Sequence, residues 1–166
     1  MLRTPKALLR PPRDEDLQAV RELVQDPDVV MWNPRSRIPD ETAVTFSIIV
    51  DDGRYAGTVT LHDIDRAGRR AAVGYRVAPW ARGRGLAAEA VRAVVDWAFG
   101  PLELERIELT HAVENTASCR VAQKAGFALE AILPANKRFG DGRLHDEHRH
   151  GLSIGTQADP AASRQR

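Results

Sequence analysis

The feature that most constrains the fold is a strand–helix–strand succession in the middle of the chain. Residues 72–77 (AVGYRV) and 106–113 (RIELTHAV) alternate in the manner of strands, with every second side chain apolar. A helix between them is predicted from apolar residues at helical spacing: Ala87, Val91, Val94, Val95 and Ala98. It should end where Gly100 and Pro101 follow Phe99. A helical crossover of this kind predicts that the two strands lie parallel.

Hairpins are predicted on both sides of this succession. FSIIV (46–50) and YAGTVTLH (55–62) flank Asp51-Asp52-Gly53, and FALEAIL (127–133) is followed by a turn at 140–142 and a polar last strand at 143–154. We therefore expect a largely antiparallel sheet that becomes parallel in the middle.

Helices and loops complete this outline. A helix capped by Asp14 should end near Asp26-Pro27, and a short helix is predicted over SCRVAQKA (118–125). The segment NPRSRIPDE (33–41) is expected to be a loop. The fold class is thus mixed α/β (α+β).

Size and charge narrow the function classes. The 166 residues predict one domain over residues 1–155, with a disordered tail at 156–166. A net charge of +1 without interleaved aromatic and basic residues argues against a nucleic-acid partner. The single Cys119 excludes an intrachain disulfide, and no apolar run suits a signal peptide or a membrane span. We expect a cytoplasmic protein with no membrane partner.

The segment RGRGLAAEAV (82–91) predicts an anion site. Residues 66–88 contain six arginines and no carboxylate, so the positive end of the following helix lacks the acidic residues that usually complement it. Gly83 and Gly85 allow backbone conformations in which successive N–H groups face one concavity. The alternative is a solvated basic turn. Gly83, Gly85 and Ala88 also satisfy G-x-G-x-x-G/A, but the residues before them do not form the tight turn of a dinucleotide fold.

Several motifs together resemble one family. The segments that carry the resemblance are RGRGLA (82–87), which fits the pattern [QR]-x-x-G-x-[GA], YRVAP (75–79), NTASCRVAQKAGF (115–127), RPPRDEDL (10–17), DPDVVMWNP (26–34), EAIL (130–133) and GDGRLHD (140–146). Over roughly residues 8–154 the chain resembles the GCN5-related N-acetyltransferase (GNAT) family, and within it the subgroup that acetylates ribosomal-protein N-termini. The resemblance implies a mixed, mostly antiparallel sheet with a splayed central parallel pair and helices on both faces.

The resemblance also implies a reaction, the attack of a primary amine on the thioester of acetyl-CoA. It assigns the pyrophosphate to the N–H groups of Gly83, Arg84, Gly85, Leu86 and Ala87, with Arg82 and Arg84 nearby, and it counts Ala88 among the cofactor-binding residues. It assigns the pantetheine arm and the thioester carbonyl to the backbone of Val77, whose N–H would act as an oxyanion donor.

Asn115 matches a cofactor contact of the family, although a plain helix N-cap explains it equally well. Ser118 matches the serine that the subgroup places near the leaving thiolate, and helix capping is its alternative role. Because a serine hydroxyl is a far weaker acid than a thiol, we expect Ser118 to offer the thiolate mainly a hydrogen bond.

Two positions depart from the family pattern. Ala122 stands where many relatives have a catalytic tyrosine, which leaves a non-catalytic acyl-CoA-binding or regulatory domain as an alternative function. The general base is unassigned, with Glu130 and Asp146 as candidates alongside the histidines 111, 145 and 148. Without an obvious base, an α-amine is favoured, since a pKa near 8 leaves about a tenth of it neutral at pH 7.

The remaining calls concern metals and partners. His145, His148 and His150 suggest a metal, but alternating histidines on a terminal strand are weak evidence, so no metal is expected. Between Trp32 and Phe46 the chain is shorter than is usual in the subgroup, so the acceptor side is expected to be open or completed by another subunit. A homodimer is therefore one expectation.

Overall fold

The computed structural model describes residues 1–34 and 41–156. Within them the strands are β1 (Leu2–Arg3), β2 (Ala7–Arg10), β3 (Val44–Val50), β4 (Tyr55–Asp65), β5 (Arg70–Val77), β6 (Arg106–Ala112), β7 (Ala128–Arg138) and β8 (Leu144–Ser153). The α-helices are α1 (Leu17–Leu23), α2 (Pro27–Trp32), α3 (Leu86–Phe99) and α4 (Thr116–Lys124), with 3-10 turns η1 (Asp14–Asp16) and η2 (Pro79–Ala81).

All the strands belong to one sheet, in the order β1-β2-β3-β4-β5-β6-β8-β7. Neighbours are antiparallel except β5 and β6, which are parallel, so the predicted fold class is confirmed. The last strand, β8, lies between β6 and β7 rather than at an edge. The polar sequence of β8 therefore enters the interior of the sheet.

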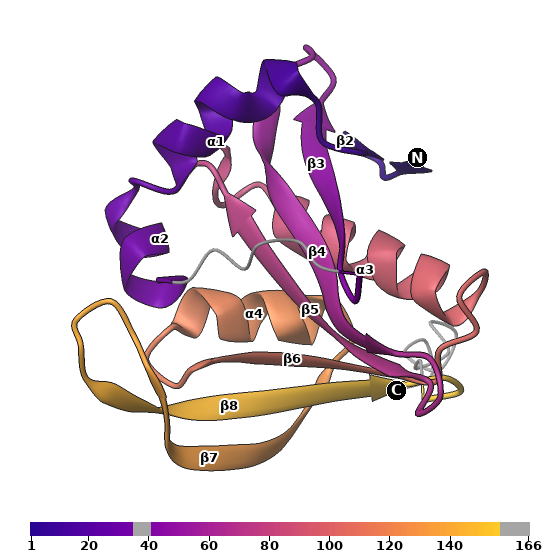
Figure 1. The fold of residues 1–166 in the computed structure, drawn as a ribbon, viewed down its shortest axis with the longest axis vertical. Coiled ribbons are helices and arrows are strands. Elements are labelled where there is room, and N and C mark those ends of the chain that lie inside the picture. The colour runs from indigo at the N-terminus through magenta and orange to yellow at the C-terminus, as the bar shows by residue number, and fades with distance from the viewer. Residues whose placement is uncertain (35–40, 157–166) are drawn as a thin grey trace, which may run out of the picture.

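The parallel pair separates soon after it begins. β5 and β6 are paired only from Arg70–Ala72 to Arg106–Glu108, at the start of both strands. Beyond this point β5 turns away from β6, and α4 lies at the resulting opening (Figure 1). The carboxyl ends of these two strands thus border a gap in the sheet.

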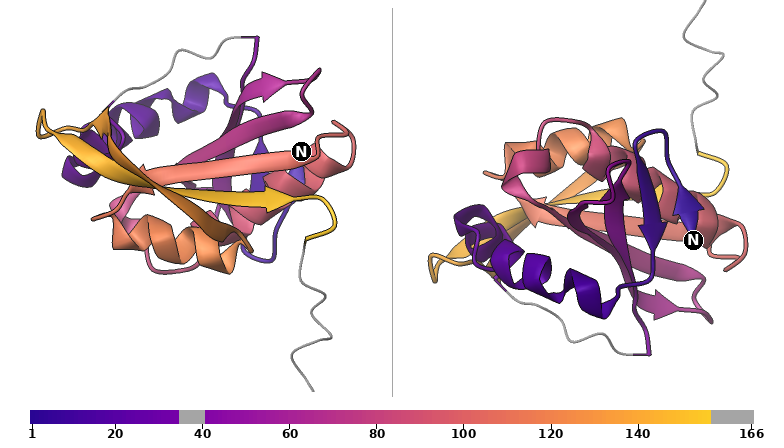
Figure 2. Two further views of the ribbon diagram at one scale, coloured as in Figure 1. Left: turned by 90° about the horizontal axis from the view of Figure 1, so that it is seen from below. Right: turned by 90° about the horizontal axis from the view of Figure 1, so that it is seen from above.

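Helices cover both faces of the sheet, with α1 and α2 on one side and α3 and α4 on the other (Figure 2). The predicted apolar side of α3 is confirmed, because Val91, Val94 and Ala98 are fully buried. They pack in one core with Val59 and Leu61 of β4. This packing fixes the amino end of α3 beside the carboxyl end of β5.

Three elements were not expected from the sequence. β1 and β2 extend the sheet at the N-terminal edge, and α2 begins where the first helix was expected to end. Asp26 caps α2 by accepting a hydrogen bond from the N–H of Val29, and Pro27 occupies the first helical position. An Asp-Pro pair can therefore start a helix as well as stop one. Of the expected loop 33–41, residues 35–40 lie outside the described part.

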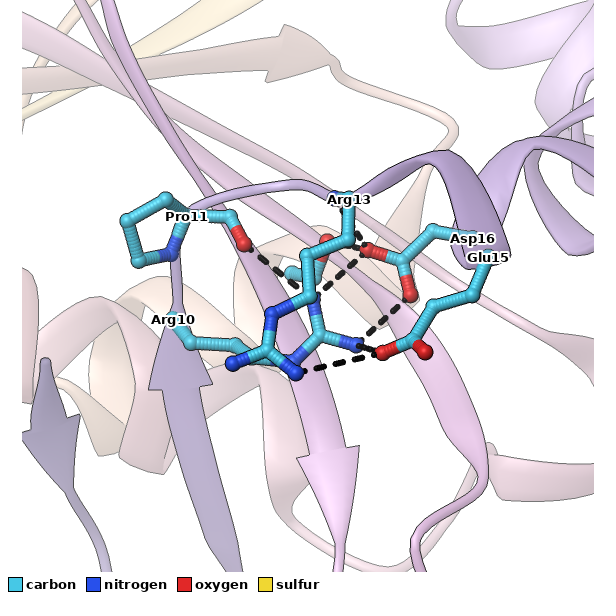
Figure 3. Close-up of polar contacts among 6 residues, drawn as sticks. Arg10, Pro11, Arg13, Glu15 and Asp16 are labelled. Carbon is cyan, nitrogen blue, oxygen red and sulfur yellow. Dashed lines mark hydrogen bonds and ion pairs between the residues drawn. The ribbon is translucent and has the colours of Figure 1, made fainter.

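The start of α1 also differs from the prediction, because Asp16 rather than Asp14 holds it (Figure 3). Asp16 accepts from the backbone N–H of Arg13 (2.9 Å) and from Ser47 Oγ (2.8 Å), and it forms a two-pronged ion pair with Arg10 (2.8 and 2.9 Å). Burial raises the pKa of Asp16, but the hydrogen bond from Arg10 and the other donors outweigh it and hold that pKa below its usual range. The pair ties α1 to β2 and β3.

In the described part of the chain, no helix is long and apolar enough to cross a bilayer. The predicted tail falls, from residue 157 on, outside the described residues.

Candidate active site

A cavity of about 430 Å³ lies where β5 and β6 diverge, which is a typical size for a ligand site. Its walls come from α2, the end of β5, the turn before α3, the β6–α4 turn and one side of α4. The lining residues used below are Asp28, Trp32, Tyr75, Arg76, Val77, Arg82, Gly83, Gly85, Leu86, Ala87, Ala88, Glu114, Asn115, Ser118, Arg120 and Lys124.

The glycine turn provides unpaired backbone donors at this cavity. Gly83 and Gly85 have φ of +74° and +80°, a region that disfavours other residues, and Gly85 is the N-cap of α3 without a side-chain cap. Across residues 1–34 and 41–156, no acceptor takes a hydrogen bond from the N–H groups of residues 83–88. The first bond back into the turn is donated by Glu89 N–H to Gly85 O (3.1 Å). An anion at this end of α3 would find several N–H donors and the positive end of the helix dipole.

The two arginines of the turn lie differently from the expectation. The guanidinium of Arg82 donates to Val77 O (3.1 Å), to Asp28 (2.8 Å) and to Asp26. The carboxylates of Asp26 and Asp28 thus compete with any phosphate for the positive charge of Arg82. Arg84 approaches the Trp80 ring, 6.0 Å from its centroid, and it is absent from the cavity lining. The structure therefore places the backbone of the turn at the cavity together with an Arg82 side chain that is already paired with carboxylates, while Arg84 lies outside the lining.

The backbone of Val77 faces the gap between the strands. Ala78 N–H donates to Ala56 O on β4 (2.8 Å), and successive N–H groups of a strand point to opposite sides. The N–H and C=O of Val77 therefore point away from β4, and the contact of its carbonyl with Arg82 agrees with this direction. β6 is no longer paired with β5 at this level.

Asn115 and Ser118 meet at the amino end of α4. Asn115 Oδ1 accepts from Ser118 N–H (3.2 Å), so Asn115 is the N-cap of the helix. Ser118 Oγ lies 2.8 Å from the hydroxyl of Tyr75 on β5. Burial raises the pKa of Tyr75 to about 12. This hydroxyl pair bridges the opening between β5 and α4.

The candidate bases are dispersed. Glu130 is bound by Arg106 near the other end of β6, and Asp146 accepts from Ala135 N–H (2.8 Å); neither lines the cavity. His111 is buried with Nδ1 on Ala112 O, and His148 lies opposite it on β8. These four residues are therefore not brought to the cavity.

His145 is close to the cavity because it contacts a lining residue. Its Nδ1 lies 3.1 Å from Glu114 Oε1 and its Nε2 lies 2.8 Å from Asp141 Oδ2. Hydrogen bonds with Asp141 and then with Glu114 raise the pKa of His145. The ring also packs edge-on against Trp32 of α2 and against Phe139.

Sequence reasoning missed several residues of the cavity, among them Tyr75, Glu114, Arg120 and Lys124. The alternation of Tyr75 with Val73 and Val77 indicated a core position on a strand. That pattern does not reveal that the Tyr75 hydroxyl reaches α4. Arg120 and Lys124 carry a signal that was available, since basic residues four apart share one side of a helix. Glu114 had no signal beyond its place before Asn115.

The chain is similar to known acetyltransferases. A family model described as "Acetyltransferase (GNAT) domain" matches residues 6–128. The Bacillus subtilis protein named "Putative ribosomal N-acetyltransferase YdaF" is 35% identical over 95 residues, which are 57% of this chain and 51% of YdaF. The chain thus spans about half the length of that relative.

Two further similarities cover more of the chain. The spermidine N(1)-acetyltransferase of Escherichia coli K12 is 30% identical over 140 residues, 75% of this chain and 74% of that protein. The crystal structure of spermidine N-acetyltransferase from Vibrio cholerae in complex with CoA and spermine superposes with a TM-score of 0.81 over 92% of this chain and 98% of the other, at 21% identity. At this identity the superposition shows a shared fold.

Proposed function

The chain belongs to the GNAT acetyltransferase family, and on that premise we propose that it is an acetyl-CoA-dependent N-acetyltransferase acting on a primary amine. The observation that carries the proposal is the cavity between β5 and β6. It has unpaired N–H groups at one end and the Tyr75–Ser118 hydroxyl pair at the gap between β5 and α4.

The residues present fit the phosphates of CoA. The N–H groups of residues 83–88 would hold the pyrophosphate, and an added Cβ at Gly83 would meet no protein atom within 4 Å, so the turn is open to a ligand. Arg120 and Lys124 would supply the positive charge that the turn arginines do not. In this proposal Arg82 is a positioning residue that holds the Val77 carbonyl and α2 in place.

When bound, acetyl-CoA supplies the acetyl thioester that the amine attacks, giving the N-acetyl product and a free CoA thiol. The chain would contribute the Val77 N–H as a hydrogen-bond donor to the thioester oxygen, a role worth a few kcal/mol in other enzymes. Asn115 would act through Ser118, since it orients the first turn of α4.

The hydroxyl pair would stabilise the leaving sulfur without protonating it. A tyrosine with a pKa of about 12 is about 3.5 units weaker as an acid than a thiol near 8.5, so full proton transfer would cost about 5 kcal/mol. A hydrogen bond to a charged partner still contributes about 1.5–3 kcal/mol. Tyr75 and Ser118 would therefore act as hydrogen-bond donors. The departing CoA thiolate would take its proton from the attacking nitrogen, which becomes positively charged when it bonds to the acetyl carbon and loses that proton to give the neutral amide, or from water.

The acceptor amine would enter beside α2, where Trp32 and the carboxylates of Asp28 and Glu114 line the cavity. Glu114 with His145 is the proposed route for the amine proton, because they form the hydrogen-bonded acid–imidazole pair at this wall. The two carboxylates at this wall, paired with Arg82 and His145, would attract a cationic amine, and the E. coli and V. cholerae relatives are named for spermidine. A protein N-terminus is the other acceptor that we consider.

Assembly and location are part of the proposal. The edge strand β7 exposes Leu129 and Ile132, which a second copy of the chain would cover in a homodimer. Light scattering after size exclusion tests this, and a monomer at all concentrations would contradict it. Because the reaction consumes acetyl-CoA and Cys119 is a free thiol, we place the protein in the cytoplasm.

The deciding experiment is a CoA-thiol release assay over an amine panel of polyamines, peptides with free N-termini, free amino acids and amino sugars. Turnover with one class supports the proposal and names the acceptor. Tight acetyl-CoA binding with no release on any amine would instead support a non-catalytic acyl-CoA-binding domain. A preference for lysine ε-amines would contradict the α-amine expectation.

A further inference from the structure

A second cluster of chemically active side chains lies next to the cavity but is not used by the proposed acetyl transfer. The ligand atoms of His111, Cys119, His148 and His150 all lie within 4.8 Å of one another. His111 is on β6 directly opposite His148 on β8, and His150 is two residues further along β8, so all three rings share one face of the sheet. Cys119 reaches them from α4, which packs on that face.

The separation of these histidines from His145 has a simple cause. His148 and His150 differ by two residues and point the same way, whereas His145 is an odd number of residues away. His145 instead bonds Asp141 and Glu114. The cluster that the sequence suggested as 145, 148 and 150 thus loses His145 and gains His111 from β6 and Cys119 from α4.

Hydrogen bonding leaves ring nitrogens of this cluster without partners. His111 Nδ1 lies 2.7 Å from the carbonyl of Ala112, so it carries the proton and its Nε2 presents a lone pair. That Nε2 lies 3.0 Å from His150 Nε2. Nδ1 of His148 and Nδ1 of His150 are buried and have no hydrogen-bond partner among the residues that the structure describes. Leaving buried polar atoms unsatisfied is costly, and a ligand for imidazole lone pairs would relieve it.

The hydrogen bond from His111 Nδ1 to the carbonyl of Ala112 also resembles the usual arrangement of a metal-bound histidine. In such sites one ring nitrogen binds the metal and the other donates to a backbone carbonyl. Burial lowers the pKa of both His111 and His150, that of His150 to about 4.

We propose that His111, Cys119, His148 and His150 form a transition-metal site for a zinc-class divalent ion, with one thiolate and three imidazole ligands. A tetrahedral zinc with Zn–N of about 2.05 Å and Zn–S of about 2.3 Å places its ligand atoms about 3.3–3.6 Å apart. The observed limit of 4.8 Å requires side-chain adjustments of about an ångström. Binding displaces the Cys119 thiol proton to solvent.

The site would fasten α4 to β6 and β8. Cys119 follows Ser118 directly, and the other three ligands sit on the paired strands, so the ion would link the helix that carries Ser118 to the sheet. With four protein ligands the coordination is complete, which is typical of a structural rather than a catalytic site. The site is independent of the proposed acetyl transfer, which needs no metal.

The test is titration of the metal-stripped, untagged full chain with Co²⁺. We expect one equivalent to bind with the visible bands of tetrahedral cobalt and a near-ultraviolet thiolate-to-cobalt band, and Zn²⁺ to displace it. Free Zn²⁺ at 100 times its Kd should raise the melting temperature by about 5–10 °C. The absence of saturable binding, or binding without the thiolate band, would overturn the proposal.

Variants locate the site. His150 is fully buried, so the substitutions are Cys119→Ser and His148→Gln, with His62→Gln on β4 as the control outside the cluster. We expect Cys119→Ser to lose the thiolate band and both cluster variants to bind at least about 10-fold more weakly, while His62→Gln binds as the parent. Wild-type affinity in both cluster variants would refute the assignment.

The parent chain offers a readout that needs no substitution. Cys119 is its single cysteine, so Zn²⁺ should protect that thiol from a thiol-reactive reagent. Equal reaction rates with and without Zn²⁺ would count against the site.

Discussion

Gly83→Glu should separate binding of the cofactor from folding, with Gly53→Glu as its matched control. Both glycines have positive φ, +74° and +82°, and an added Cβ at either would meet no atom within 4 Å. Each substitution therefore carries the same left-handed strain of about 1–2 kcal/mol. Both melting temperatures should fall by a similar amount, about 2–8 °C for a chain of this length.

Only Gly83 lies in the turn that lines the cavity. A carboxylate about 5 Å from one phosphate charge costs about 3 kcal/mol at the effective dielectric of about 20 near a protein surface. Acetyl-CoA affinity should therefore fall roughly 150-fold in Gly83→Glu. Gly53→Glu, in the β3–β4 turn, should keep the parent affinity.

Isothermal titration calorimetry gives the two affinities, and thermal melting by circular dichroism gives the two stabilities. Raised salt should recover part of the lost affinity, because the repulsion between the new carboxylate and the phosphate is screened. Unchanged acetyl-CoA affinity in Gly83→Glu, or an equal loss in both variants, would refute the assignment of the turn to the pyrophosphate.

Three further outcomes are expected. Tyr75→Phe and Ser118→Ala should each lower kcat about 10- to 150-fold with little change in acetyl-CoA affinity. Because the two hydroxyls share one hydrogen bond, the losses should not add in the double variant. Additive losses in steady-state kinetics would contradict the proposal that the two residues act together. Asp16→Ala leaves the buried Arg10 with the exposed Glu15 in place of its buried two-pronged partner, and should lower the free energy of unfolding by about 3–5 kcal/mol in urea titrations. A loss below about 1 kcal/mol would show that the Arg10–Asp16 pair is dispensable. Folding raises the pKa of His145, so the stability that this residue contributes is complete below about pH 6.5 and is lost as the pH rises through the higher folded pKa. The melting temperatures of the parent and of His145→Gln should therefore converge as the pH rises through that range. A difference that stays constant with pH would contradict the linkage.

Local patterns predicted the elements around the site correctly. Alternation located β5 and β6, helical spacing located α3, and the glycines with positive φ stand where the turn before α3 was expected. These features depend on residues close together in the chain, because face periodicity and left-handed conformations are local properties. The same patterns missed α2, because the Asp26-Pro27 signal that ends one helix also begins the next.

The sequence did not predict which side chains from distant parts of the chain contact one another. Tyr75 and Ser118 are 43 residues apart, and their contact exists because β5 leaves β6 and meets α4. Glu130 was an equally reasonable base from its motif, yet the pairing of β7 beside β8 brings it to Arg106 instead.

The sequence by itself determined the order and type of most elements, the acid-free glycine turn at the start of α3, and the family. The tertiary structure alone decided that β8 lies between β6 and β7, because strand order depends on which apolar faces can be buried together. That insertion places a polar strand inside the sheet and gathers three histidines and Cys119 under α4. The contact of Arg82 with Asp26 and Asp28 of α2 is likewise a long-range contact that the sequence did not reveal. Periodicity specifies which way a side chain points from its own strand, and only packing specifies what it meets.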